Sequence, residues 1–265
     1  MRSLIAMGLS AYLSVTACAA EIPLFDAHIH YGHDIWDTIS PEKAIAKLRK
    51  AGIRKALVSS ANDDGTLMLL REAPDLIVPA LTPYRKVGEL AIWLRDESVP
   101  AYLEERLKKA GYVALGEFHA YGAEADLPVV RRVVQLARKH GLYLHADSDA
   151  QAIERIFQQD PNARVIWAHA GNDPAHRVLA MLRKYENLWC DLAMRDRIAQ
   201  NGELLPEWRA AFAEFPDRFM IGTDTYSVGI WGEVEAHAAS VRRWLSGLPS
   251  EIAERIAYKN AETLF

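Results

Sequence analysis

Short apolar runs alternate with helical stretches along most of the sequence, and this alternation constrains the fold more than any other feature. Eight of the runs are short enough to be buried strands of a parallel sheet. Most of the gaps between them carry helical patterns. The runs are Ile22–His28, Ile53–Ser60, Leu76–Leu81, Tyr112–Phe118, Leu142–Ala146, Arg164–Ala168, Leu188–Leu192 and Arg218–Thr223. A repeated strand and helix order of this kind predicts an α/β fold.

The helical stretches have recognisable ends. Ser40 followed by Pro41 is typical of a helix start, and Gly52 closes that helix just before the second apolar run. Apolar residues at helical spacing run from 128 to 140 and stop at Gly141, a typical helix terminator. These boundaries separate the helices clearly from the predicted strands.

Eight strand and helix units in a chain of 265 residues predict a (β/α)8 TIM barrel over residues 21–265. The alternative is an open doubly wound sheet, which usually carries a glycine-rich phosphate-binding turn after its first strand. The segment from His28 to Gly32 is not such a turn. The barrel is therefore preferred, and reactive groups are expected at the C-terminal ends of its strands.

Residues 1–20 differ from the rest and are interpreted as a secretory signal peptide, because a positive start is followed by a largely apolar stretch and small residues. The apolar stretch is too short for a permanent membrane anchor. Val15-Thr16-Ala17-Cys18 resembles a bacterial lipobox, which would place a lipid on Cys18. Ordinary cleavage at the same small residues is the alternative. We expect export to the periplasm, with the lipoprotein form preferred and membrane contact only through that lipid.

Charge and cysteine content restrict the classes of binding partner and the disulfides that the chain can have. The formal net charge is −4, and basic residues occur singly or in pairs, so a nucleic acid is not favoured. A small-molecule substrate is expected instead. Cys190 is the one cysteine beyond residue 20, which leaves no partner for an intramolecular disulfide in the mature chain. Its apolar surroundings favour packing in a strand over a role as nucleophile.

His28 and His30 stand two residues apart at the end of the first predicted strand. Side chains at i and i+2 project to the same side of a strand, so both imidazoles can reach one metal ion, with Leu24 and Asp26 on the same face. Two merely structural histidines are the alternative. Further metal-binding residue types follow other strands. They are Glu117 after the fourth, His145 after the fifth, His169 after the sixth and Asp224 after the eighth. A barrel would bring them together, and such nitrogen and oxygen donors suit zinc and related divalent ions.

Six segments of the sequence resemble motifs of the amidohydrolase superfamily of metal-dependent barrel hydrolases. The matching segments are Phe25–His30, Gly116–Phe118, Leu144–Ala146, Ala168–Gly171, Gly222–Thr225 and Lys259–Phe265. The resemblance implies that His28, His30 and Asp224 hold one metal ion. It implies that His145 and His169 hold a second, and that Glu117 bridges the two.

The chain also resembles single-metal branches of the superfamily. In those branches His28, His30, His145 and Asp224 would bind the one ion. His169 would then act as a general base or electrophile. Because these branches include decarboxylases, the reaction type is less constrained than the dependence on metal.

A bound divalent ion would lower the pKa of its water towards about 7. Asp224 is expected to take the proton from this water and return it to the leaving group. The sequence therefore predicts an exported hydrolase, with Zn²⁺ as the expected ion, acting on a small ester, lactone, amide or phosphoester. A single-metal decarboxylase and a metal-binding barrel without catalysis are the alternatives.

Residues just past the strand ends are candidates for substrate contact, because such loops line the pocket of a barrel. Arg195 is suited to a carboxylate or phosphate, although a solvated loop arginine is the alternative. The residues selected for this role are His119, Asn172 and Arg195.

Overall fold

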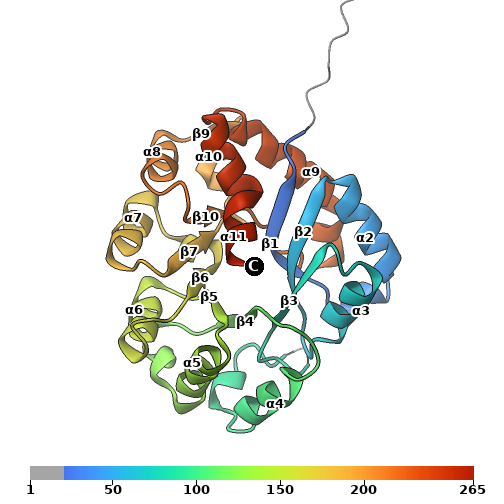
Figure 1. Cartoon of the computed structure of the whole chain (residues 1–265), viewed down its shortest axis with the longest axis vertical. Helices are drawn as coiled ribbons and strands as arrows, with labels where there is room; N and C mark the ends of the chain where they lie inside the picture. Colours follow the sequence, from blue (N-terminus) through green and yellow to red (C-terminus); the bar gives the residue numbers. More distant parts are fainter. Residues whose placement is uncertain (1–20, 87) are drawn as a thin grey trace, which may run out of the picture.

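The computed structural model describes residues 21–86 and 88–265, so the predicted signal peptide and Cys18 lie outside the described residues. Eight parallel strands form one sheet in chain order, from β1 to β7 and then β10. They surround the centre of the molecule, and helices lie outside them (Figure 1). The strands are β1 Leu24–His30, β2 Ile53–Ser59, β3 Ile77–Leu81, β4 Ala114–His119, β5 Tyr143–Asp147, β6 Val165–Trp167, β7 Leu188–Asp191 and β10 Phe219–Met220.

Backbone hydrogen bonds bring the first and last strands together. Ala27 N–H donates to the carbonyl of Ile221 at 2.9 Å, and Asp224 N–H donates to the carbonyl of His28 at 2.8 Å. The residues around β1 therefore meet those around β10, which brings the sheet close to a complete ring. The predicted (β/α)8 barrel is confirmed, and the open sheet is excluded.

Both helices whose ends the sequence predicts are present. The helix predicted from Pro41 is α2, and the stretch from 128 to 140 forms α5, which Gly141 ends with a left-handed φ of 65°. A two-stranded hairpin, β8 Ala199–Gln200 and β9 Glu203–Leu204, precedes α8. The helices are α1 His33–Trp36, α2 Pro41–Lys50, α3 Asp64–Glu72, α4 Val99–Arg106, α5 Pro128–His140, α6 Ala150–Gln159, α7 Ala175–Lys184, α8 Pro206–Glu214, α9 Val228–Leu245, α10 Ser250–Glu254 and α11 Asn260–Leu264.

The helices outside the sheet cover a large apolar core. No helix of the described ranges is long and apolar enough to cross a membrane. A smaller apolar cluster gathers residues from most of the strands together with α11. The ring of Phe265 lies 5.8 Å from Phe25 and 5.4 Å from Tyr143. The chain thus ends near the centre of the ring of strands (Figure 1).

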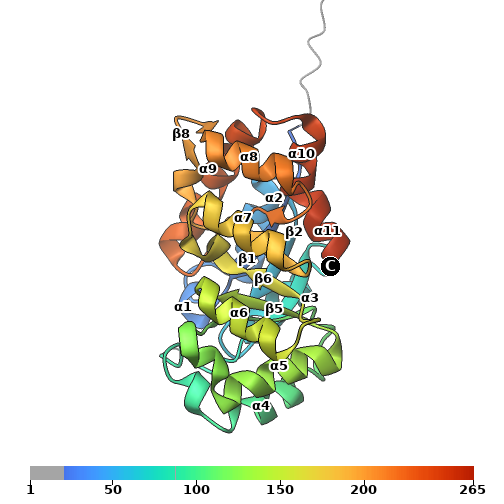
Figure 2. The ribbon, with the colours of Figure 1, turned by 90° about the vertical axis from the view of Figure 1, so that its left-hand side faces the viewer.

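The two ends of the barrel lie on opposite sides of the molecule. Viewed from the side, α1, which follows β1, and β8 lie on the left, while α11 and the chain end lie on the right (Figure 2). The C-terminal ends of the strands therefore form a mouth that is separate from the end covered by α11.

Candidate metal centre

Four predicted ligands meet at the mouth of the barrel. His28 Nε2 lies 3.1 Å from His30 Nε2, 3.4 Å from Glu117 Oε1 and 3.7 Å from Asp224 Oδ1. His30 Nε2 lies 3.2 Å from Glu117 Oε2 and 3.4 Å from Asp224 Oδ1. Ligands about 2.0–2.1 Å from a tetrahedral zinc stand roughly 3.3 Å apart. The spacing of these four groups therefore fits a single divalent ion.

The strand ends hold these ligands through hydrogen bonds. Ser59 Oγ lies 3.1 Å from His30 Nδ1, which leaves Nε2 free to face the centre. Below it, the fully buried Asp26 carboxylate accepts hydrogen bonds from the backbone N–H and hydroxyl of Thr223 at 3.0 and 2.6 Å. Asp26 thereby joins β1 to the segment that carries Asp224. Asp224 itself has a left-handed φ of 55°, a strained conformation that is common at functional sites.

His169 completes the cluster, and its ring lies 5.0 Å from that of His28. Its Nε2 lies 3.3 Å from Glu117 Oε1 and 3.9 Å from Asp224 Oδ2. Its Nδ1 lies 3.0 Å from the carbonyl oxygen of Ala193, and its φ is 56°. His169 is therefore aimed at the space beside the four ligands.

His145 is placed differently from the other predicted ligands. Its Nε2 lies 2.8 Å from Asp191 Oδ2, below the cluster, and the side chains of both residues are buried. The other oxygen of Asp191 accepts hydrogen bonds from the backbone N–H groups of His169 and Ala193. Asp191 also lies 3.3 Å from His28 Nδ1. The structure thus pairs His145 with a supporting carboxylate, and its role as a metal ligand stays a prediction.

Sequence reasoning missed Asp191, although it lies at the end of a predicted strand like the other site residues. The signal was available in the Cys190-Asp191 pair, a carboxylate directly following an apolar run. None of the segments that resemble the family's motifs covers the end of the seventh strand. The buried carboxylate of Asp191 fixes the orientation of two histidines, a common arrangement around metal sites.

The carboxylates dominate the electrostatics of the cluster. Burial opposes the charged form of His28, but Glu117 and Asp191 outweigh it and raise the pKa of His28 well above its usual value. Burial likewise favours the neutral form of Glu117, yet His28 and His169 hold the pKa of Glu117 well below its usual range. The pKa of His169 rises to about 9 despite its burial, chiefly because the Glu117 carboxylate lies 3.3 Å from its Nε2.

The cluster has the chemistry that a divalent metal ion requires. Within the described part of the chain, the buried Oε1 of Glu117 has no hydrogen-bond donor of good geometry. A divalent cation at the centre would satisfy this oxygen and allow the imidazoles to give up their protons. The donor set of imidazoles and carboxylates also suits such an ion. The residues therefore fit a divalent metal.

A cavity of about 430 Å³ opens directly above the cluster. Its volume suits a small molecule. Its floor is formed by polar residues of the cluster, and part of its wall is apolar. The lining includes His30, Glu117, His119, Asp147, His169 and Asp224 together with Ile35, Tyr84, Leu90 and Tyr226. His119, predicted to contact substrate, lies in this cavity. Asp147 and Tyr84 also line it and were missed from sequence.

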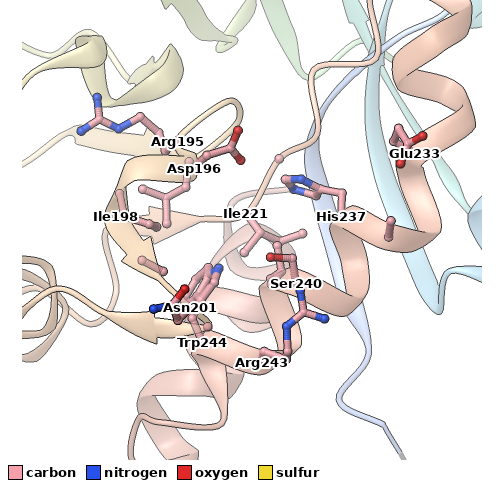
Figure 3. Close-up of a pocket in the computed structure, with 16 residues that line it drawn as sticks. Arg195, Asp196, Ile198, Asn201, Ile221, Glu233, His237, Ser240, Arg243 and Trp244 are labelled. Atoms are coloured by element: carbon pink, nitrogen blue, oxygen red, sulfur yellow. The ribbon is translucent and has the colours of Figure 1, made fainter.

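Asn172 and Arg195 lie elsewhere, lining a separate hollow between α7 and the segment after β7. Arg195 Nη2 donates to the carbonyl of Asp173 at 2.7 Å, and its guanidinium stacks 4.9 Å from the ring centre of Trp208. Arg195 also borders a cavity of about 580 Å³ against α9, where it points away from His237 and Ser240 (Figure 3). The structure therefore does not bring Asn172 and Arg195 to the metal cluster.

A (β/α)8 barrel with histidines and carboxylates at the C-terminal ends of its strands defines the class of metal-dependent barrel hydrolases. Residues 75–265 match the family model described as amidohydrolase. The chain belongs to the amidohydrolase family, a family that generally uses a divalent metal, and the prediction of a hydrolytic enzyme is confirmed. No match was found among curated proteins.

Solved structures with the same fold have low sequence identity to this chain. A TatD homolog from Escherichia coli K12 is 18% identical, with a TM-score of 0.63 over 91% of this chain and 97% of that one. A probable 2-pyrone-4,6-dicarboxylic acid hydrolase from Acinetobacter baumannii is 13% identical, with a TM-score of 0.60 over 91% and 98% of the two chains. An uncharacterized TIM-barrel protein from Bordetella bronchiseptica is 16% identical, with a TM-score of 0.60 over 85% and 82%. At these identities the likeness describes the fold alone.

Proposed function

We propose that this protein hydrolyses a small ester, lactone, amide or phosphoester at the mouth of its barrel. The observation that carries the proposal is the group of four ligand residues, His28, His30, Glu117 and Asp224, at the base of a cavity of small-molecule size. A divalent ion held there, with Zn²⁺ as our first candidate, would supply Lewis acidity and a water of lowered pKa. The chain's own residues bind and orient the substrate and move protons.

Asp224 is the proposed proton carrier. Its Oδ1 faces His28 and His30, while its Oδ2 lies 3.9 Å from His169 Nε2, so the carboxylate stands between the ligands and the open cavity. From this position it can accept a proton from an attacking water and return it to a leaving group. His169, whose Nε2 lies 3.3 Å from Glu117 Oε1, would polarise the bond being broken.

The second candidate is decarboxylation at a single ion, with release of carbon dioxide and no net addition of water. The spacing of the four ligand residues favours this candidate, because it fits a single ion. A metal-binding barrel without catalysis is the third. The presence of all four ligand residues, Asp224 among them, argues against it.

A substrate screen tests these functions. The zinc-loaded protein and an Asp224→Asn variant are assayed on esters, lactones, amides, phosphoesters and aromatic carboxylic acids, and both products and carbon dioxide are measured. Hydrolysis by the wild type that the variant loses supports the proposal. Carbon dioxide as the one product supports decarboxylation, and silence across every class supports the barrel without catalysis.

We further propose that the protein acts outside the cytoplasm, in the periplasm, on a small molecule. The signal-peptide pattern of residues 1–20 supports export, and the lipobox-like sequence ending at Cys18 supports a lipid anchor. Mass spectrometry of the mature N-terminus tests both points. A diacylated Cys18 indicates the lipoprotein, a free N-terminus near residue 20 indicates ordinary export, and an intact Met1 in a cytoplasmic fraction contradicts the proposal.

A further inference from the structure

The cavity above the metal cluster has an apolar wall that the proposed chemistry does not use. Leu90, from the segment after β3, and Tyr226, from the segment after β10, both line it, and their exposed fractions are 49% and 56%. Ile35 of α1 also lines the cavity. One exposed apolar side chain is ordinary, but several around a single cavity mark a surface that a bound molecule would cover.

Leu90 is held in place by its neighbours in the chain. Glu89 is 3% exposed, and its carboxylate accepts hydrogen bonds from the Arg85 backbone N–H at 2.7 Å and from Arg85 Nη2 at 2.9 Å. Trp93 is fully buried, and its indole N–H donates to the carbonyl of His119 at 3.1 Å. These two anchors fix the backbone on either side of Leu90 and leave its side chain half exposed at the cavity.

The same segment engages its arginine outside the cavity. Arg85 Nη2 lies 2.5 Å from Asp96 Oδ2, and Arg85 Nη1 donates to Ser98 Oγ at 2.8 Å. Among the described residues that line the cavity there is no arginine, and the one lysine is the exposed Lys86. A substrate with an additional carboxylate or phosphate would therefore find no guanidinium in the cavity to bind it.

Carboxylates line the cavity beyond the four ligand residues. Asp147 Oδ2 lies 3.1 Å from His119 Nε2, and Asp34 of α1 is exposed. An anionic substituent would be repelled by these groups, and placing it against Leu90 and Tyr226 would remove its hydration without supplying a partner. The cavity thus combines apolar contact surface with a charge distribution that opposes anions.

We propose that the substrate is an uncharged ester, lactone or amide carrying an apolar group that Leu90 and Tyr226 bind. Phosphoesters and substrates with a second carboxylate are disfavoured. This inference rests on the proposed hydrolysis and names the substrate class of the same site. Leu90 and Tyr226 act on the choice of substrate, and the bond is broken at the metal cluster below them.

A matched pair of esters tests the inference. Phenyl hexanoate and the monophenyl ester of adipic acid share chain length and leaving group, and differ by a terminal methyl against a terminal carboxylate. Water cleaves the acyl–oxygen bond of each to give the carboxylic acid and phenol. With the zinc-loaded wild type, kcat/KM should be at least about tenfold higher for phenyl hexanoate. Leu90→Ala should raise KM for this ester by about 3- to 10-fold and leave kcat almost unchanged, and Leu90→Lys should remove the preference.

Ile92→Ala is the matched control, because Ile92 is 59% exposed on the same segment but does not line the cavity. Its KM should equal that of the wild type. Equal kcat/KM values for the two esters in the wild type overturn the inference. So does an equal rise in KM in Leu90→Ala and Ile92→Ala when both variants give the wild-type circular dichroism spectrum.

A binding measurement separates this inference from the proposed function. Calorimetric titration of the zinc-loaded protein needs no turnover and should show hexanoate binding at least about tenfold more tightly than adipate. Preferential binding of hexanoate without hydrolysis in the substrate screen contradicts the proposed function and supports the inference. Hydrolysis in that screen, with equal binding of hexanoate and adipate or binding of neither, leaves the proposed function intact and overturns the inference. Absence of both binding and hydrolysis contradicts both.

Discussion

The two ends of the barrel are built from the same strands but hold opposite kinds of side chain. At the end covered by α11, apolar residues such as Phe25, Tyr143 and Met220 pack with Phe265 at the chain end. At the mouth, buried histidines and carboxylates lie 3.1–3.7 Å apart. At the first end, packed apolar side chains exclude water. At the second end, ionisable side chains lie close together in a buried space.

A single strand therefore contributes apolar residues that stabilise the fold at one end and candidate ligands at the other. β1 supplies Phe25 to the apolar end and His28 and His30 to the mouth, and β5 supplies Tyr143 to one and Asp147 to the other. Close-packed apolar groups contribute to the free energy of folding, while buried charges are costly unless paired. Substitutions at the mouth are therefore expected to change metal binding and turnover, and those at the apolar end to change stability.

The largest expected effect is at Asp224. Asp224→Asn removes the proposed proton carrier with little change in shape, so kcat on an identified substrate should fall about 10²- to 10⁴-fold. The melting temperature should stay close to that of the wild type, because the side chain packs against no apolar core. Steady-state kinetics and differential scanning calorimetry measure the two effects. Near wild-type turnover would remove Asp224 from the mechanism.

At the apolar end, the matching substitution is Phe25→Ala. Phe25 is 1% exposed, so the cavity left by its ring should lower the free energy of unfolding by about 3–5 kcal/mol. Urea denaturation measures this change, with Phe25→Leu as the milder control. Metal content of the folded variant should match that of the wild type. Loss of metal from a folded Phe25→Ala protein would show that the two ends are not independent.

The sequence carried enough information for the barrel and for most of the mouth. Strand order could be predicted because each apolar run ends at a turn or helix signal, and ligands could be placed because parallel strands end at one rim. The register between β1 and β2 shifts at two places, so strict alternation does not hold along the whole of β1: Leu24 packs in the outer core, although alternation would place it on the same face as His28 and His30.

The direction in which each side chain points could not be predicted from the sequence. His145 and Asp147 occupy the same side of β5, and only packing against Asp191 decides which of them faces the cavity. The course of the loops could not be predicted either. The turn after β7 brings Arg195 against the ring of Trp208, and no local sequence pattern fixes the course of that turn. Strand periodicity therefore predicts which residues lie at the rim, whereas tertiary contacts, which no local pattern encodes, decide which neighbouring side chain faces the cavity.

A smaller effect is expected at Asp191, which supports the mouth without facing the cavity. In Asp191→Asn one oxygen can still accept from the backbone of His169 and Ala193, but the new amide cannot accept from His145. Metal affinity should fall about 10- to 100-fold, as is usual for groups that orient ligands. Competition with a chelator measures the affinity, and Asp160→Asn is the control. Equal affinities in wild type and Asp191→Asn would show that the carboxylate is only structural.

The smallest effect is expected at Cys190, the residue next to Asp191 on β7. Successive side chains of a strand point to opposite faces, so Cys190 packs in the outer core, and burial raises the pKa of its thiol. In a Cys18→Ser background, the native protein should react with a thiol reagent far more slowly than the urea-unfolded protein. Metal binding and turnover should be unchanged in Cys190→Ala, since the thiol faces away from the mouth. Rapid native labelling, or protection of the thiol by zinc, would place Cys190 at the mouth and erase the separation between the two faces of β7.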